Sequence, residues 1–290
     1  MNSDVDATSA TCEAGDGHRR LFLKLFLVWL AVNVVVWFAP GLWESGQQTL
    51  ANWRIAQMAS HYETRGVALA EQAKATLPYL FFRPTLKANE KAPLIVVLHG
   101  SGERGNDCRA QLRTVGTFLV EPSFQSSQPC FVMAPQCPEN LRWQSSGPID
   151  VKGAFGGIID EVVLTEAVDV SRIYLMGYSM GAFGCWHYLS ETPDRFAGCI
   201  AVAGGGDPDA AAAVARTPVW AIHGKNDVVV PAESSREMVD AVIAAGGHAK
   251  LTILEKVGHG SFQVVKRTPN PYLKWLLQQR RIEGPGDEKS

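Results

Sequence analysis

The chain has 290 residues, of which 46% are hydrophobic and 19% are charged, enough for one domain with a sizeable core behind an N-terminal segment. The formal net charge of −2, without a run of Lys and Arg, excludes a basic surface for nucleic acid, so no nucleic-acid partner is expected. Six cysteines are too few for a disulfide scaffold, and none forms a C-x-x-C pair typical of zinc sites. No metal and no organic cofactor is expected.

An apolar stretch at residues 21–39 follows a basic cluster at 18–20. As a helix rising about 1.5 Å per residue, it reaches roughly 28 Å, close to the hydrocarbon thickness of a bilayer. Because the positive charges precede it, we expect residues 21–41 to be a transmembrane signal anchor, with residues 1–20 in the cytoplasm and the rest exported. The rival interpretation is a signal peptide cleaved near Ala39-Pro40-Gly41, which would leave a secreted protein.

The segment that follows, residues 42–75, is polar and alanine-rich. Apolar residues recur at helical spacing in 55–62, so we expect a helical spacer there. The spacer should lead into a single domain at residues 76–282. Residues 283–290 are expected to form a flexible tail.

Beyond residue 76, apolar runs alternate with segments of helical length. Several runs are hydrophobic throughout, as in strands buried on both faces of a parallel sheet. We therefore expect an α/β fold, a mostly parallel sheet with helices on both faces. The predicted strands lie at 77–82, 93–100, 130–136, 172–179, 199–206, 218–224 and 249–255, and the predicted helices at 157–168, 181–192, 234–247 and 270–281.

The stretch MGYSMGAFG at residues 176–184 contains a G-x-S-x-G pattern, with Ser179 between Gly177 and Gly181. It lies between a predicted strand and a predicted helix, which is the context of a nucleophile elbow. Glycines on both sides relieve crowding at the sharp turn and leave the serine Oγ exposed. The alternative is a serine in a tight turn with no catalytic role.

A nucleophilic serine needs a base, and the base needs an acid that orients it. The chain order for such an elbow is Ser, then Asp or Glu, then His. Asp227 follows the predicted strand PVWAIHG, and His259 lies in the later loop VGHGSF, so both meet this order. The two aspartates in 207–209 compete for the role of the acid. His99 and His223 end predicted strands, where packing roles are expected.

A tetrahedral intermediate also needs donors for its oxyanion. The glycine-rich LHGSGERG at residues 98–105 follows an early strand, and Met180 follows the nucleophile. We expect the backbone N–H groups of Ser101 and Met180 to supply the oxyanion hole. No G-K-[ST] follows the glycines, so the loop does not fit a phosphate-binding P-loop.

Five ordered motifs together resemble a known family. They are LHGSGERG at 98–105, APQCP at 134–138, SRIYLMGYSMGAFGCW at 171–186, PVWAIHGKNDVVVP at 218–231 and VGHGSF at 257–262. In this order they are similar to the α/β-hydrolases called predicted peptidases. That group is allied to feruloyl and acetyl esterases, dienelactone-hydrolase-like enzymes and phospholipase/carboxylesterases.

The resemblance covers about residues 77–281 and implies an α/β-hydrolase fold. It also implies that Ser179, Asp227 and His259 form the catalytic triad. The loop at Ser101 would be part of the oxyanion hole.

The chain departs from this family beside the base. The family often has H-N-S-W there, whereas Gly260 and Phe262 stand in HGSF, so the acyl or alcohol pocket is expected to differ. Candidate substrate-binding residues are Gly102, Tyr178, Trp143 and Phe262, although aromatic residues at such positions also suit a core.

These observations favour a serine hydrolase that cleaves small-molecule carboxylic esters through an acyl-enzyme, a carboxylesterase of acetyl or feruloyl esterase type. An acyltransferase or a peptidase using the same triad stays open. So does a non-catalytic binding protein that keeps the fold. The sequence indicates no particular protein partner.

Overall fold

The computed structural model describes residues 24, 49–50, 53–69, 76–115 and 118–281. Contacts divide the chain into two units, residues 1–54 and 55–290, and the second carries the fold described below. Apart from Lys24, the expected membrane anchor at 21–41 lies outside the described residues, as does the expected tail at 283–290. Among the helices that are described, none is both long and apolar enough to cross a membrane.

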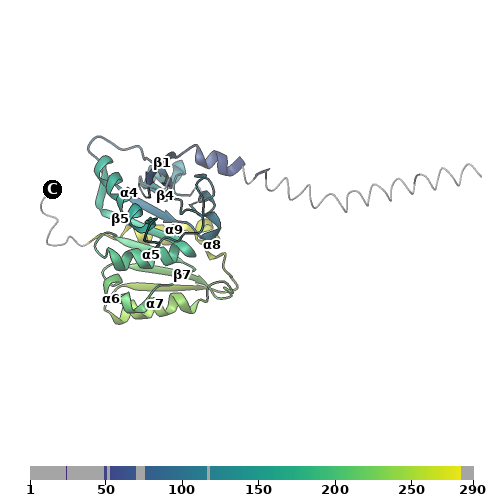
Figure 1. The fold of residues 1–290 in the computed structure, drawn as a ribbon, viewed down its shortest axis with the longest axis vertical. Helices are drawn as coiled ribbons and strands as arrows, with labels where there is room; N and C mark the ends of the chain where they lie inside the picture. The colour runs from purple at the N-terminus through teal and green to yellow at the C-terminus, as the bar shows by residue number, and fades with distance from the viewer. Residues whose placement is uncertain (1–23, 25–48, 51–52, 70–75, 116–117, 282–290) are drawn as a thin grey trace, which may run out of the picture. The chain divides into compact units, whose positions relative to one another are not determined.

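An eight-stranded sheet forms the centre of the second unit (Figure 1). Its strands are β1 (Glu63–Ala68), β2 (Thr76–Phe82), β3 (Ala92–Leu98), β4 (Phe131–Pro135), β5 (Val168–Tyr178), β6 (Gly198–Val202), β7 (Val219–Gly224) and β8 (Ala249–Leu254). Their order is β1-β2-β4-β3-β5-β6-β7-β8. The six strands from β4 to β8 run parallel, whereas β1 and β2 pair antiparallel at one edge. The predicted mostly parallel sheet is therefore confirmed.

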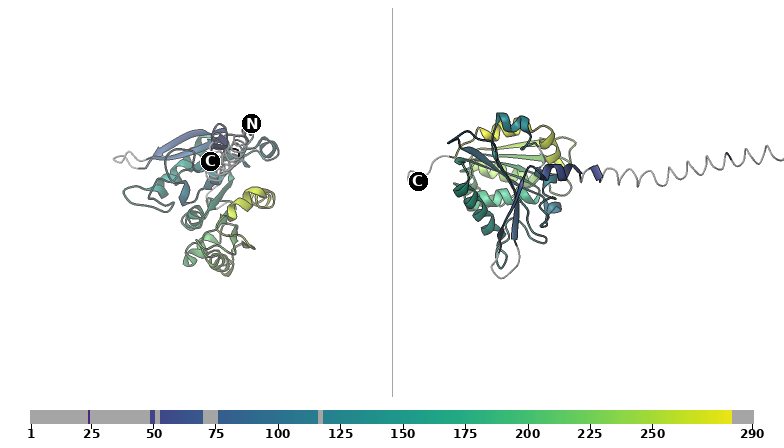
Figure 2. Two further views of the ribbon diagram at one scale, coloured as in Figure 1. Left: turned by 90° about the vertical axis from the view of Figure 1, so that its right-hand side faces the viewer. Right: turned by 90° about the horizontal axis from the view of Figure 1, so that it is seen from above.

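Helices cover both faces of the sheet, and Figure 2 shows the strands between two helical layers. One layer packs on the core that contains Leu94, and its helices are α4 (Val151–Thr165), α5 (Met180–Glu191), α6 (Ala211–Val214) and α7 (Glu233–Ala244). The other layer packs on the core that contains Ile95, and its helices are α2 (Leu112–Val115), α3 (Pro122–Ser127), α8 (Ser261–Arg267) and α9 (Pro269–Leu277). Two short 3-10 turns, η1 (Ser101–Glu103) and η2 (Pro208–Ala210), follow β3 and β6.

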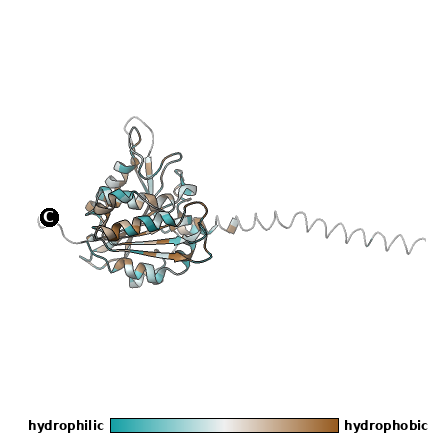
Figure 3. Cartoon of the chain, turned by 90° about the horizontal axis from the view of Figure 1, so that it is seen from below, coloured by the Kyte–Doolittle hydropathy of each residue, from teal (hydrophilic) through white to brown (hydrophobic). Residues whose placement is uncertain are grey.

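Strand β3 shows why the central strands read as unbroken apolar runs. All seven of its residues are buried, and successive side chains enter opposite cores. Leu94 and Val96 join the core under α5, while Ile95 and Val97 join the core under α9. Each such side chain contributes about 1.5–3 kcal/mol of burial free energy. Figure 3 shows the hydrophobic segments in the strands and in the covering helices.

Strand β1 corrects the helical spacer expected over residues 42–75. The helix ends at residue 59, and β1 then pairs with β2 through six positions. The sequence ETRGVA carries no apolar run because β1 is an edge strand with exposed residues along it. Arg65 ties it to the domain by donating to Glu166 at 2.9 Å and by lying 4.3 Å from the centroid of the Phe81 ring. The sheet therefore begins before residue 76.

Candidate active site

Ser179 occupies a sharp turn between the end of β5 and the start of α5. Its backbone has φ 52° and ψ −117°, in a region that non-glycine residues rarely adopt. Such a conformation costs about 1–3 kcal/mol and persists where surrounding contacts hold it. Here the N–H of Ser179 donates to the Val202 carbonyl at 2.8 Å, and its carbonyl accepts the N–H of Ala182 at 2.8 Å. The turn therefore has the backbone geometry of a nucleophile elbow.

The two glycines of the motif allow this turn to pack closely. A Cβ at Gly177 would overlap the backbone of Gly181 and the Cys185 sulfur. A Cβ at Gly181 would overlap the Leu98 carbonyl and lie 2.8 Å from the His99 carbonyl oxygen. The start of α5 therefore rests directly on the end of β3, which brings the elbow beside the loop that follows β3.

Ser179, His259 and Asp227 form one chain of hydrogen bonds. His259 Nε2 lies 2.9 Å from Ser179 Oγ, and His259 Nδ1 lies 2.8 Å from Asp227 Oδ2. Because a carboxylate accepts, Nδ1 carries the hydrogen and Nε2 is free to accept the serine proton. The structure thus brings together the three residues predicted from the sequence, from loops after β5, β7 and β8.

The environment of Asp227 keeps it ionised. Burial alone would raise the pKa of Asp227, but the N–H groups of Val230 and Val229 and the His259 ring outweigh burial, so its pKa lies below its ordinary value. The two N–H groups both donate to Oδ1 at 2.9 Å. Asp227 therefore presents its other oxygen, Oδ2, to the histidine.

Tyr178 holds the loop that carries the base. Its hydroxyl donates to the backbone carbonyl of His259 at 3.0 Å, and the two ring centroids are 5.3 Å apart. The ring also lies against Phe262, with centroids 5.6 Å apart. The substrate-binding role of Tyr178 stays a prediction, whereas its contact with the His259 loop is visible.

The loop after β3 places candidate oxyanion donors near the elbow. In the part of the chain that the structure describes, the N–H groups of Ser101 and Met180 have no hydrogen-bond partner. Ser101 and Gly102 are exposed, and a Cβ at Gly102 would meet nothing within 4 Å. Both N–H groups are free to donate to an oxygen that develops negative charge, and the predicted oxyanion hole stays a prediction.

Buried hydrogen bonds from His99 and Trp143 hold the loop that follows β3. Backbone N–H of Cys137 donates to His99 Nε2 at 2.9 Å, so Nδ1 carries the hydrogen that is donated to the Gly100 carbonyl at 2.6 Å. Burial lowers the pKa of His99 to about 4, which keeps the ring neutral. The Trp143 indole N–H then donates to the His99 carbonyl at 3.0 Å. The sequence predicts only a packing role for His99, because it ends a strand.

The structure buries two of the residues that were predicted to contact substrate. Trp143 is 0% exposed and packs edge-on to Phe155 inside the core, so its ring offers no surface to a substrate. Phe262, a residue of α8, is 2% exposed and points into the opposite core. Both large rings gain more by leaving water than by lining a pocket, and Trp143 finds a partner for its N–H inside.

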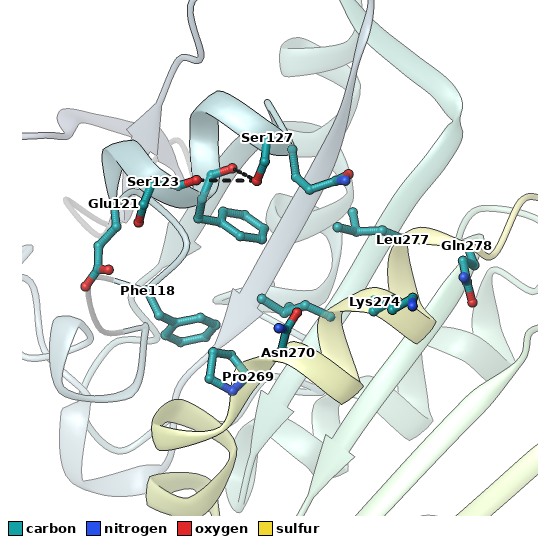
Figure 4. A pocket seen from close by; sticks show the side chains of 12 residues that line it. Phe118, Glu121, Ser123, Ser127, Pro269, Asn270, Lys274, Leu277 and Gln278 are labelled. Atoms are coloured by element: carbon teal, nitrogen blue, oxygen red, sulfur yellow. Dashed lines mark hydrogen bonds between the residues drawn. The ribbon is translucent and has the colours of Figure 1, made fainter.

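A wide surface pocket of about 790 Å³ lies between α3 and α9, away from the triad residues. Figure 4 shows Phe118 on one side of this pocket and Asn270, Lys274 and Leu277 of α9 on the other. It contains no base paired with a nucleophile. The described residues also hold no group of three or more His, Cys, Asp or Glu that could bind a metal ion.

The sheet order and the elbow define an α/β-hydrolase. A solved structure of a thermostable esterase aligns with a TM-score of 0.70 at 30% identity, over 78% of this chain and 64% of that one. A solved ferulic acid esterase aligns with a TM-score of 0.60 at 15% identity, over 75% of this chain and 98% of that one. The second likeness shows the fold alone.

Sequence comparisons show which α/β-hydrolases this chain is similar to. Residues 142–274 match the profile of the Dienelactone hydrolase family. A bifunctional acetylxylan esterase/xylanase from Neocallimastix patriciarum is 27% identical over 140 residues, which are 48% of this chain and 20% of that protein. The chain thus spans less than two thirds of this relative and of the thermostable esterase. The predicted resemblance to dienelactone-hydrolase-like enzymes and to acetyl esterases is confirmed. The resemblance to feruloyl esterases is confirmed for the fold.

Proposed function

We propose that this protein is a serine esterase that cleaves small-molecule carboxylic esters through an acyl-enzyme on Ser179. The observation that carries the proposal is the continuous chain from Ser179 Oγ through His259 to Asp227, at 2.9 and 2.8 Å. A serine with this base and acid, at a strained elbow, is equipped for nucleophilic attack.

The geometry supports the following sequence of steps. His259 Nε2 removes the Ser179 hydroxyl proton while Oγ attacks the ester carbonyl carbon, and Asp227 stabilises the imidazolium that forms. The N–H groups of Ser101 and Met180 stabilise the negative carbonyl oxygen. The tetrahedral intermediate collapses, and the leaving alkoxide takes the proton from His259. Water then attacks the acyl-enzyme with the same base, releasing the acid and restoring Ser179.

Acetyl and feruloyl esters are the proposed substrates. The names of two relatives, an acetylxylan esterase/xylanase and a ferulic acid esterase, support this choice. Ester alkoxides also leave more readily than amines, which favours an esterase over a peptidase.

Labelling with a fluorophosphonate probe tests the proposal on the full chain. The wild type should be labelled, and Ser179→Ala and His259→Ala should not be, because the probe reacts only with an activated serine. Ser126→Ala, which removes an exposed hydroxyl on α3, is the matched control and should be labelled like the wild type. A folded wild-type chain that resists labelling would contradict the proposal and favour a non-catalytic binding protein.

Product analysis separates hydrolysis from acyl transfer. Short-chain p-nitrophenyl and feruloyl esters should give the free acid in water. With glycerol or a sugar added, a new ester as the main product would instead identify an acyltransferase.

We further propose that residues 21–41 anchor the protein in a membrane, with the hydrolase domain on the extracytoplasmic side. The apolar length and the preceding basic cluster support this arrangement. The chain should then stay in the membrane pellet after alkaline carbonate extraction. Recovery of a shortened chain in the medium would favour the alternative of a cleaved signal peptide and a secreted protein.

A further inference from the structure

A second histidine contacts the acid of the triad. His223 lies near the end of β7, and its side chain is 0% exposed. Its Nε2 lies 2.9 Å from the Val230 carbonyl oxygen and 3.3 Å from Asp227 Oδ2. Its Nδ1 lies 2.7 Å from the hydroxyl of Ser235 on α7. The sequence had suggested only a packing role for this residue.

The partners of His223 determine where its hydrogen lies. A carbonyl oxygen can only accept, so Nε2 must carry a hydrogen, which it donates to the Val230 carbonyl at 2.9 Å. His223 Nε2 is therefore the protonated nitrogen, and it lies 3.3 Å from Oδ2 of the proposed catalytic acid.

Counting donors around Asp227 shows what this contact completes. Oδ1 accepts two backbone N–H groups, from Val229 and Val230, and Oδ2 accepts the ring N–H of His259, while His223 Nε2 lies 3.3 Å from the same oxygen. A carboxylate has about four acceptor positions, so these hydrogen bonds occupy three of them, and the protonated Nε2 of His223 lies beside the same carboxylate. The Asp227 side chain is 0% exposed, and water cannot replace a donor that is removed.

The Nδ1 side of the His223 ring is connected to the turn that carries Ser179. Ser235 Oγ, which contacts Nδ1, also donates to the Gly204 carbonyl at 2.6 Å. Gly204 lies against the elbow, since a Cβ there would be 3.1 Å from the Ser179 carbonyl oxygen. A continuous series of contacts thus joins the acid, α7 and the loop after β6 that supports the nucleophile.

We infer that His223 is a positioning residue for Asp227, holding Oδ2 in line with His259 Nδ1. This inference rests on the proposed function. The two backbone donors fix one oxygen of the carboxylate, and His223 prevents the other from turning away from the base. Losing this donor therefore weakens the orientation of His259 rather than the binding of substrate.

Variants of His223 test the inference through kinetics. His223→Met keeps a side chain of similar size without a donor, and kcat should fall about 10- to 100-fold with KM within about twofold, the effect of one unsatisfied buried acceptor. His223→Gln can place an amide N–H where Nε2 stands, beside Val230 and Asp227, and should restore most of kcat. Ile222→Ala is the control, because Ile222 is equally buried on the same strand but faces the opposite core. Its kcat should stay near the wild-type value in the folded protein.

A spectroscopic signal tests the same point without turnover. The hydrogen between His259 Nδ1 and Asp227 Oδ2 should give a low-field proton resonance in the full chain and in Ser179→Ala, identified by its absence in His259→Ala. His223→Met should shift or remove that resonance, and His223→Gln should return it. Absence of fluorophosphonate labelling would contradict the proposed esterase function. The resonance tests the positioning role of His223 independently of that result.

The inference is overturned by an unchanged resonance in folded His223→Met, or by a kcat loss in Ile222→Ala as large as that in His223→Met. Equal losses in His223→Gln and His223→Met would overturn it too. If His223→Met does not fold, Ser235→Ala takes its place. That variant keeps the ring but frees Nδ1, and it should move the resonance, while an unmoved resonance counts against the inference.

Discussion

Trp143→Phe distinguishes a residue that supports the oxyanion loop from one that binds substrate. The change keeps an aromatic ring but removes the indole N–H that donates to the His99 carbonyl at 3.0 Å. That carbonyl precedes Gly100 and Ser101, whose backbone forms the proposed oxyanion site. Substrate cannot reach the Trp143 ring, because the residue is 0% exposed.

The cost of this change has two parts. Leaving the buried His99 carbonyl without its donor costs about 1–3 kcal/mol. The smaller ring leaves unfilled volume beside Phe155, which at about 24 cal/mol per Å³ adds roughly 1 kcal/mol. The free energy of unfolding should therefore fall by about 2–4 kcal/mol, and kcat should fall with it while KM stays nearly constant.

Urea unfolding and steady-state kinetics on a p-nitrophenyl ester measure both quantities. Tyr188→Phe is a suitable control, since it removes the hydroxyl that donates to the Trp143 carbonyl but does not contact His99. It should lower stability by about 1 kcal/mol and leave kcat largely intact. If Trp143→Phe kept the wild-type urea midpoint and raised only KM, the ring would be contacting substrate and the reasoning from burial would fail.

Three further predictions concern the elbow, the base and acid pH. Gly181→Ala should abolish activity and lower the free energy of unfolding by more than about 3 kcal/mol, because the new Cβ would overlap the Leu98 carbonyl. Near-normal unfolding together with normal fluorophosphonate labelling would instead show that the start of α5 is free to move. Tyr178→Phe removes the hydroxyl that donates to the His259 carbonyl. It should lower kcat severalfold and the free energy of unfolding by about 1 kcal/mol, as measured by steady-state kinetics and thermal unfolding. A change confined to KM would instead favour a contact between Tyr178 and substrate. Asp227 and Glu166 both have lowered pKa values, because burial, which would raise them, is outweighed by their hydrogen-bond donors. A lowered folded-state pKa gives stability that is complete above the unfolded value near 4 and lost as the pH falls through the folded value, so the urea midpoint should drop below about pH 4. Glu166→Gln should flatten that drop, and an identical acid profile would refute the contribution of Glu166.

The central strands and the order of the triad were predictable for physical reasons. A strand buried on both faces must be apolar at every position, as in β3, and this leaves a run that is easy to recognise. The elbow requires glycine on both sides of Ser179, because any Cβ would overlap neighbouring atoms. In both cases the structural requirement restricts the residue type itself.

Other features depend on partners that are distant along the chain. The fully buried position of Trp143 depends on His99, 44 residues away, and the contact of His223 with Ser235 depends on how α7 packs. Strand β1 was missed because an exposed edge needs no apolar pattern. Helix α4 begins six residues before its predicted start at 157. Asp150 caps this start, and the three glycines among the first seven residues of the helix weaken its apolar periodicity.

The two outer strands of the sheet bear on how separate copies of the protein behave in solution. An edge strand carries backbone groups that can pair with a strand of another molecule, and charged side chains oppose such joining. On β1, Arg65 is held in ion pairs with Glu63 and Glu166, and at the other edge Lys250 of β8 lies over the Trp220 ring. A strand added at either edge would have to approach these charges. The same contacts that fasten β1 to its own domain therefore also disfavour sheet-to-sheet aggregation.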